Sequence, residues 1–189
     1  VWPKHPLGRP LTGVDATLDG LNRSRLLDFR ERHYRSESIL VIAAGGIRHE
    51  ALLREVKQRA AHLPEGRASL YEPASGEPRS PRLKHVMRRG NQAQIALGVT
   101  ACSRHDPKRH ALRVLNAVLG ENMSSRLFQH IREDRGLAYS IHSSLSNLED
   151  TGLLVVSAGL DEANLDKTLR LLDLEFARLR EALVPSKEL

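Results

Sequence analysis

The sequence has little cysteine, few aromatic residues and no long apolar run. Among its 189 residues there is one cysteine, Cys102, and aromatic side chains make up 4%. A single cysteine can form neither an internal disulfide nor a zinc site built from several cysteines. No apolar run approaches the ~18 residues of a membrane-spanning helix. These absences exclude a disulfide scaffold, a multi-cysteine zinc site and a transmembrane chain.

The charge that is present is basic and evenly spread. Lysine and arginine number 29 against 23 aspartates and glutamates, which gives a formal net charge of +6. The cations are mostly arginines that alternate with acids, as in Arg132-Glu133-Asp134-Arg135. This pattern is typical of a solvated helix surface and disfavours nucleic acid as a partner. A nucleic-acid-binding α+β module remains as an alternative, although the strands lack the aromatic platform of such modules.

Apolar periodicity predicts a mixture of helices and strands. Helical spacing predicts helices over about 22–34, 48–63, 107–119, 124–132 and 161–179. Continuous or alternating apolar residues predict strands over 38–44, 92–99, 138–148 and 153–160. The turn residues at 149–152 join the last two strands as a hairpin. Hairpins mixed with helices predict an α+β fold with a largely antiparallel sheet and helices packed on one face.

Residues 64–81 differ in composition from the rest of the chain. Proline and glycine recur there at positions 64, 66, 73, 76, 78 and 81, and no periodicity survives. Such a segment is typical of a linker. We therefore expect two parts, residues 1–63 and residues 82–189, on either side of a linker at 64–81.

The common motifs of catalytic and metal sites are missing. The nine histidines are scattered, with no His-x-x-Glu-His or His-x-x-x-His pattern, and there is no Gly-x-Ser-x-Gly or Gly-x-Gly-x-x-Gly. Cys102 precedes His105 in an expected loop, but a lone cysteine at a strand end is more simply a small apolar residue. The residues themselves predict no cofactor and no metal ligand in this chain.

One stretch places two strong hydrogen-bond donors around a break. Arg132 falls at the end of a predicted helix, Gly136 interrupts it, and Tyr139 begins the next strand. An arginine and a phenol that converge can hold a carbonyl oxygen or a developing oxyanion. A surface salt bridge made by Arg132 is the simpler alternative, and the residues alone leave both open.

The same stretch carries a family resemblance. The segments Leu119–Phe128, Ile131–Glu133 and Gly136–Ser140 strongly resemble the pitrilysin/insulinase family of zinc metallopeptidases, which includes the mitochondrial processing peptidases. The opening His5–Pro10 is similar to the segment that follows the zinc ligands of that family. The resemblance runs along nearly the whole chain and is weakest in the linker.

The resemblance implies a two-domain clamp of similar α+β halves that closes over a peptide. Zinc is the implied cofactor, held in the first half by an inverted His-x-x-Glu-His helix and a later glutamate. Residues 1–63 would be the C-terminal part of that first half, and 82–189 the incomplete N-terminal part of the second. Arg132 and Tyr139 would be the catalytic pair that reaches across to the substrate backbone and the transition state.

The zinc motif does not occur in these 189 residues, so the expectations for the full-length protein and for this piece differ. The full-length protein is expected to be a zinc metalloendopeptidase, whereas this piece is expected to bind no zinc and to be inactive alone. The alternative is a non-catalytic partner subunit of a heterodimer. The expected partners are a peptide or protein substrate and a second family member, as homodimer or heterodimer. By resemblance, the protein is expected to be soluble, in the bacterial periplasm or cytoplasm.

Overall fold

The chain forms two compact units in a computed structural model. The structure describes residues 1–189 except 4, 68–70, 75–81, 88–89 and 189. The sheet unit comprises Val1–Leu7 and Ala74–Leu189, and the helical unit comprises Gly8–Pro73. Much of the expected linker at 64–81 lies outside the described residues, so the division into 1–63 and 82–189 stays a prediction.

The helical unit contains α1 (Asp15–Leu18), α2 (Arg23–His33), the short 3-10 turn η2 (Ser36–Ser38) and α3 (His49–Ala60). The predicted helix start at Asn22 is confirmed, because its side chain accepts a hydrogen bond from the Arg25 N–H at 3.0 Å. Such a cap satisfies one of the free N–H groups of the first turn. No residue of α1, α2 or α3 is fully buried.

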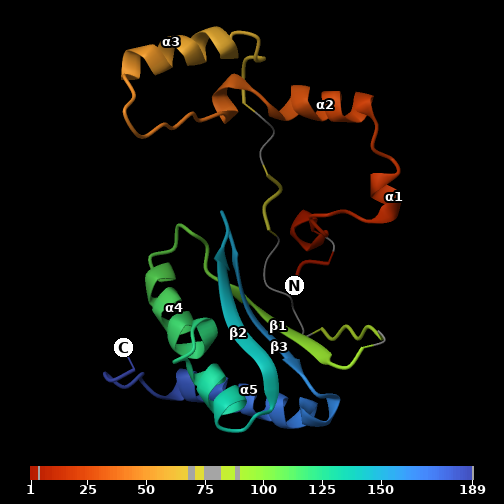
Figure 1. The fold of residues 1–189 in the computed structure, drawn as a ribbon, viewed down its shortest axis with the longest axis vertical. Coiled ribbons are helices and arrows are strands. Elements are labelled where there is room, and N and C mark those ends of the chain that lie inside the picture. The colour runs from red at the N-terminus through yellow and green to blue at the C-terminus, as the bar shows by residue number, and fades with distance from the viewer. Residues whose placement is uncertain (4, 68–70, 75–81, 88–89, 189) are drawn as a thin grey trace. The chain divides into compact units, whose positions relative to one another are not determined.

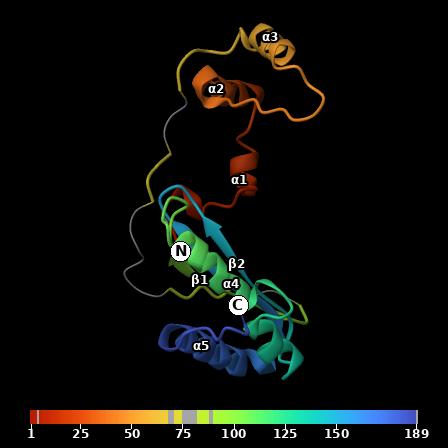
Figure 2. The same cartoon turned by 90° about the vertical axis from the view of Figure 1, so that its left-hand side faces the viewer.

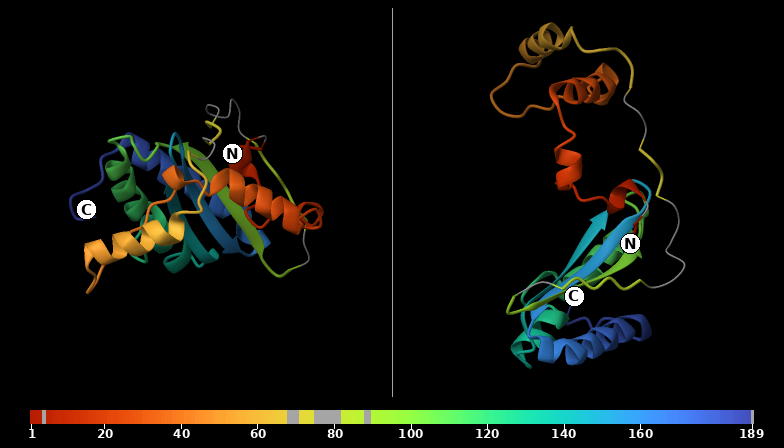
Figure 3. Two further views of the ribbon diagram at one scale, coloured as in Figure 1. Left: turned by 90° about the horizontal axis from the view of Figure 1, so that it is seen from above. Right: turned by 90° about the vertical axis from the view of Figure 1, so that its right-hand side faces the viewer.

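The strand predicted over 38–44 is wrong. Residues 39–44 form an irregular connection between α2 and α3, seen in orange in Figure 3. Leu40 and Ile42 are 82% and 81% exposed. A strand needs a neighbouring strand for its N–H and C=O groups, and the described part of the helical unit contains none. An apolar run alone therefore did not decide the structure here.

The sheet unit is built on three antiparallel strands, β1 (Ala93–Ala101), β2 (Ala138–Asn147) and β3 (Gly152–Leu160). Their order is β1-β3-β2, so the hairpin partner β3 lies in the middle (Figure 1). Both pairings are antiparallel. The predicted hairpin and the predicted strand at 92–99 are confirmed.

One face of this sheet carries the core. The predicted alternation along β1 is confirmed, since Ile95 and Leu97 pair with Ala158 and Val156 on the inward face of β3. The helical segments of the unit are α4 (Arg109–Asn116), η3 (Ala117–Glu121), η4 (Phe128–Glu133), η5 (Glu162–Asn164) and α5 (Leu165–Glu181), drawn with the sheet in Figure 2. Helices and strands share one buried cluster, made by Leu119, Leu127, Ile131, Ala138, Ile141, Leu154, Val156, Ala158, Leu160 and Leu172. The predicted α+β class is thereby confirmed.

The helix that begins after Asp106 continues further than its sequence predicts. The glycine pattern predicts an end at Gly120, but α4 runs on into the π-helical turn η3, which ends at Glu121. Gly120 is buried, and a Cβ atom there would lie 2.9 Å from the backbone nitrogen of Ser143 on β2. Gly120 thus serves a close approach of helix to strand rather than a helix stop.

Candidate functional site

Arg132 lies on the outward side of η4, near its end. Its side chain is 43% exposed, and the guanidinium carbon sits 4.7 Å above the centre of the Phe128 ring. Arg132 and Phe128 are four residues apart, which places them on one side of a helix. Among the described residues, Arg132 forms an ion pair only with the adjacent Glu133, at 3.9 Å. This leaves most of the five N–H donors of the guanidinium available.

A glycine turn carries the chain from η4 into β2. Gly136 has φ of +58°, a left-handed conformation that glycine adopts without strain. Its N–H donates to the Arg132 carbonyl at 3.0 Å, and the Leu137 N–H donates to the Ile131 carbonyl at 2.9 Å. The predicted break at Gly136 is confirmed, and the turn holds the two flanking elements in a fixed relation.

Tyr139 is the extra residue of a β-bulge. Ala138 pairs with Leu160 and Ser140 pairs with Gly159, so Tyr139 has no partner on β3. Ala138 and Ile141 both face the core, three positions apart, which an unbroken strand would not allow. The bulge therefore points Tyr139 away from the core, where it is 58% exposed. Bulges that re-aim a side chain occur often beside active sites.

Arg132 and Tyr139 thus belong to one structural unit and both face outward. No hydrogen bond or ring contact joins them to each other within the described chain, and the Tyr139 hydroxyl has no protein partner there. The salt-bridge alternative for Arg132 is weak, because an exposed pair of adjacent residues contributes little to stability. Together they offer a permanent cation and a neutral O–H donor to a ligand.

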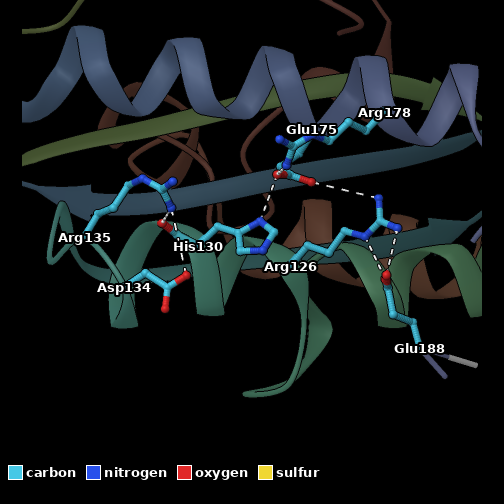
Figure 4. A network of polar contacts seen from close by, with 7 residues as sticks. All are labelled: Arg126, His130, Asp134, Arg135, Glu175, Arg178 and Glu188. Atoms are coloured by element: carbon cyan, nitrogen blue, oxygen red, sulfur yellow. Dashed lines mark hydrogen bonds and ion pairs between the residues drawn. The ribbon is translucent and has the colours of Figure 1, made fainter. Parts of the chain in front are cut away.

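A polar network around one buried carboxylate, behind η4, has no counterpart in the sequence predictions. Glu175 on α5 is 2% exposed and receives a hydrogen bond from the Arg178 side chain at 2.6 Å. The same carboxylate lies 2.9 Å from Nδ1 of His130 and 3.9 Å from the Arg126 guanidinium (Figure 4). The sequence shows Glu175 next to the apolar Phe176 on the predicted helix, but the leucine periodicity alone does not show that this acid faces inward.

Arg126 extends this network to the far end of the chain. Its Nε and one terminal nitrogen donate to the two carboxylate oxygens of Glu188 at 2.8 and 3.3 Å. These hydrogen bonds hold the pKa of Glu188 below its ordinary value of 4.5, and partial desolvation opposes them. Two carboxylates that are far apart in sequence, Glu175 and Glu188, therefore lie close to one half-buried arginine.

The other residues singled out from the sequence have structural partners of their own. His105 lies 2.9 Å from Glu149, which Arg104 also contacts, and this group joins the end of β1 to the hairpin turn. Cys102 is half-buried, and the Asn147 amide donates to its carbonyl at 2.8 Å. No contact links Cys102 to His105 among the described residues, so the geometry gives no support to a Cys–His pair.

The described residues do not fit a zinc site. In that part of the chain, no three histidine, cysteine, aspartate or glutamate side chains gather as metal ligands. Three protein ligands are the usual minimum for a catalytic zinc. Nor does any described helix have the length and apolar character required to cross a membrane.

Fold and site together define an α+β fold with one outward-facing donor before a glycine turn, Arg132, and one after it, Tyr139. Residues 20–189 match the family model described as the peptidase M16 inactive domain. The chain therefore belongs to the peptidase M16 family, and the resemblance stated from its motifs is confirmed.

Curated relatives agree with this assignment. An uncharacterized zinc protease of Streptomyces coelicolor is 38% identical over 176 residues, which are 87% of this chain and 37% of the relative. An uncharacterized zinc protease of Bacillus subtilis is 32% identical over 189 residues, 100% of this chain and 45% of the relative. The chain thus spans less than half the length of these relatives.

Solved structures show the same fold. A peptidase M16 inactive domain from Pseudomonas fluorescens superposes with a TM-score of 0.90 at 23% identity, over 100% of this chain and 46% of that one. A protease from Helicobacter pylori gives 0.76 at 20% identity, over 93% and 44%. At this level of identity the likeness establishes architecture and leaves activity to be argued from the site.

Proposed function

We propose that this chain supplies the substrate-holding part of a zinc-dependent peptidase, with Arg132 and Tyr139 as donors to the peptide backbone. The observation that carries the proposal is the turn at Gly136, which separates two outward-facing donors, one on η4 and one on β2. Membership of the M16 family and the zinc protease names of the relatives support the reaction class. The function rests on these residues rather than on a metal centre in the chain.

The two side chains would act by stabilising charge. When water adds to a peptide carbonyl, its oxygen becomes an oxyanion, and donors aimed at that oxygen lower the barrier. The Tyr139 phenol donates one O–H, and the Arg132 guanidinium keeps its charge at every physiological pH. Both residues bind and orient the substrate, and neither has to gain or lose a proton.

Zinc enters this proposal only as a property of another part of the enzyme. Because the described residues do not fit a zinc site, the metal would be held outside them, on the same polypeptide or on a partner subunit. A complete two-half enzyme and a heterodimer whose second subunit carries the metal use Arg132 and Tyr139 in the same way. The zinc content of each purified subunit distinguishes these two arrangements.

The first prediction concerns turnover by the assembled, zinc-loaded peptidase. Tyr139→Phe removes one hydroxyl and Arg132→Ala removes the cation, and we expect each to lower kcat by about 10²–10³-fold, the typical cost of losing one oxyanion donor. Zinc content and melting temperature should stay close to those of the wild type, because both side chains are exposed. Peptide cleavage, metal analysis and thermal unfolding measure the three quantities.

Two matched variants serve as controls. Tyr34→Phe alters a tyrosine of similar exposure in the helical unit, and Arg180→Ala removes an exposed arginine that also pairs with its neighbouring glutamate. Both should leave kcat within about twofold of the wild type, as surface changes away from a site usually do. Near-normal turnover of Tyr139→Phe and Arg132→Ala, or a loss that merely follows unfolding, would refute the proposed function.

A further inference from the structure

A buried carboxylate lies behind the helical turn that carries Arg132. Glu175 occupies the inward stripe of α5 together with Thr168 and Leu172, which are 0% and 1% exposed. A buried charge is costly unless it is paired. Glu175 meets this requirement with partners from two elements, Arg178 of α5 itself and Arg126 and His130 of the facing segment.

The pairing of Glu175 is tight on one oxygen and loose on the other. Oε1 lies 2.9 Å from His130 Nδ1 and accepts from Arg178 at 2.6 Å. Oε2 has no hydrogen-bond partner in the described protein, and its only close cation is Arg126 at 3.9 Å. A buried ion pair of this kind is weak evidence for stability, since an apolar residue often packs as well. We therefore look for the role of this ion pair in the positions of the elements that it joins.

Residues 126–132 present three stripes, each made by two residues four positions apart. Arg126 and His130 face α5 and contact Glu175 (Figure 4). Leu127 and Ile131 enter the core and are 0% exposed. Phe128 and Arg132 form the remaining, outward stripe. Because the stripes are fixed relative to one another by the helix, the contact with α5 determines where the outward stripe is presented.

The contacts continue past the end of η4. The Arg135 side chain donates to the His130 carbonyl at 2.6 Å, just before the Gly136 turn. His130, which contacts Glu175, is therefore also hydrogen-bonded to Arg135 in the turn that leads to Tyr139. Glu175 therefore links α5 to η4 and, through His130, to the C-terminal turn of η4.

We infer that Glu175 is a positioning residue for Arg132. Its carboxylate sets the rotation of η4 on α5, and through it the direction in which the Arg132 guanidinium is offered to substrate. This inference rests on the proposed function, in which Arg132 holds the peptide. Misplacing a catalytic group by as little as about 1 Å can cost about 10²-fold in rate, so a residue without substrate contact can still control turnover.

The test compares Glu175→Gln with Glu181→Gln, an exposed acid on the same helix. In the assembled peptidase, Glu175→Gln should lower kcat by about 10- to 100-fold with KM changed less than about threefold. Combined with Arg132→Ala, it should add little further loss, because the two changes act on one interaction. Glu181→Gln should leave kcat unchanged, both in the otherwise wild-type protein and in the Arg132→Ala variant.

A second measurement on the 189-residue chain separates this inference from the proposed function. Hydrogen exchange of amides 126–137 should accelerate in Glu175→Gln, while β1 and β3 keep their protection. Should Glu175→Gln not fold, His130→Ala removes the same contact from the η4 side and should give the same kinetic result. Unchanged exchange, unchanged kcat, or equal losses with and without Arg132 would overturn the positioning role. Normal turnover of Arg132→Ala would instead refute the proposed function.

Discussion

At the scale of the residue, two arginines of the sheet unit have different environments. Arg132 is outward and weakly paired, whereas Arg126 has a side chain only 15% exposed and holds two carboxylates. Arginine suits both tasks because its planar fork can bind a carboxylate at two points and never loses its charge. The weakly paired Arg132 is the arginine expected to bind a ligand, and the strongly paired Arg126 is the one expected to hold the structure.

The strongly paired arginine leads to a pH prediction. The Arg126 hydrogen bonds hold the pKa of Glu188 below its ordinary value, so the folded state binds this proton less readily than the unfolded state. The stabilisation is therefore fully present above the unfolded pKa and is lost as pH falls through the folded one. Because Glu188 is 38% exposed, we expect a contribution of under about 1 kcal/mol.

Chemical denaturation of the wild type and of Glu188→Gln measures this effect. At pH 7 the wild type should be the more stable of the two, and the two free energies of unfolding should converge as pH falls below the ordinary carboxyl pKa of 4.5 and then through the lower folded value. Glu181→Gln, which alters an exposed acid, should track the wild type at both values. A difference that stays constant with pH would show that Arg126 does not distinguish the charged from the neutral carboxyl.

At the scale of the element, the closest packing joins η3 to β2. A Cβ atom at Gly120 would lie 2.8 Å from Oγ and 3.0 Å from Cβ of Ser143, besides the strand backbone. Distances below 3.0 Å to backbone cannot be relieved by turning a side chain, so helix and strand would have to separate. Gly120→Ala should lower the free energy of unfolding by about 1–3 kcal/mol, the usual cost of overpacking.

Gly90→Ala provides the matched comparison, because a Cβ atom there meets nothing within 4 Å. It should change stability by no more than about 0.5 kcal/mol, as an open surface position does. Urea midpoints at constant slope measure both variants. Equal stability of the two alanine variants would mean that η3 can move off β2 without cost.

The elements also show which parts of the fold could be predicted from sequence. Strands β1, β2 and β3 were predictable because each pairs within the chain and its alternation matches the buried face. The strand predicted from the apolar run was wrong, because residues 39–44 have no neighbouring strand to pair with and an apolar pattern cannot supply one. The π-helical turn at Gly120 could not be predicted, because it packs against the backbone of Ser143, 23 positions away in the sequence.

The candidate site was predictable only in part. Motif position pointed to Arg132 and Tyr139, and the structure places both on the outside of the sheet unit. The means of placing them could not be inferred, because a bulge appears only once two strands are in register. Glu175 was missed because an acid at helical spacing becomes exceptional only when its neighbours are known to be buried.

At the scale of the whole molecule, the chain is expected to lack a metal centre of its own. The described residues offer no group of three potential ligands, and the nine histidines of the sequence are scattered. The purified 189-residue chain, equilibrated with zinc and then dialysed, should retain far less than one equivalent, since catalytic sites need three protein ligands. Elemental analysis measures the retained metal, and about one tightly held zinc per chain would contradict this expectation.

The direction of Tyr139 is determined by the number of residues in β2 rather than by the kind of residue. Ala138 and Ile141 both reach the core because two residues of β2 lie between them, whereas only Gly159 lies between their partners on β3. Substitutions along the strand preserve that count, so a scan of point mutants would leave the tyrosine outside. A single deletion between 138 and 141 would instead remove the bulge and restore the regular alternation of the strand. In related chains, gaps at this point of an alignment therefore carry more functional information than the identities of the residues around them.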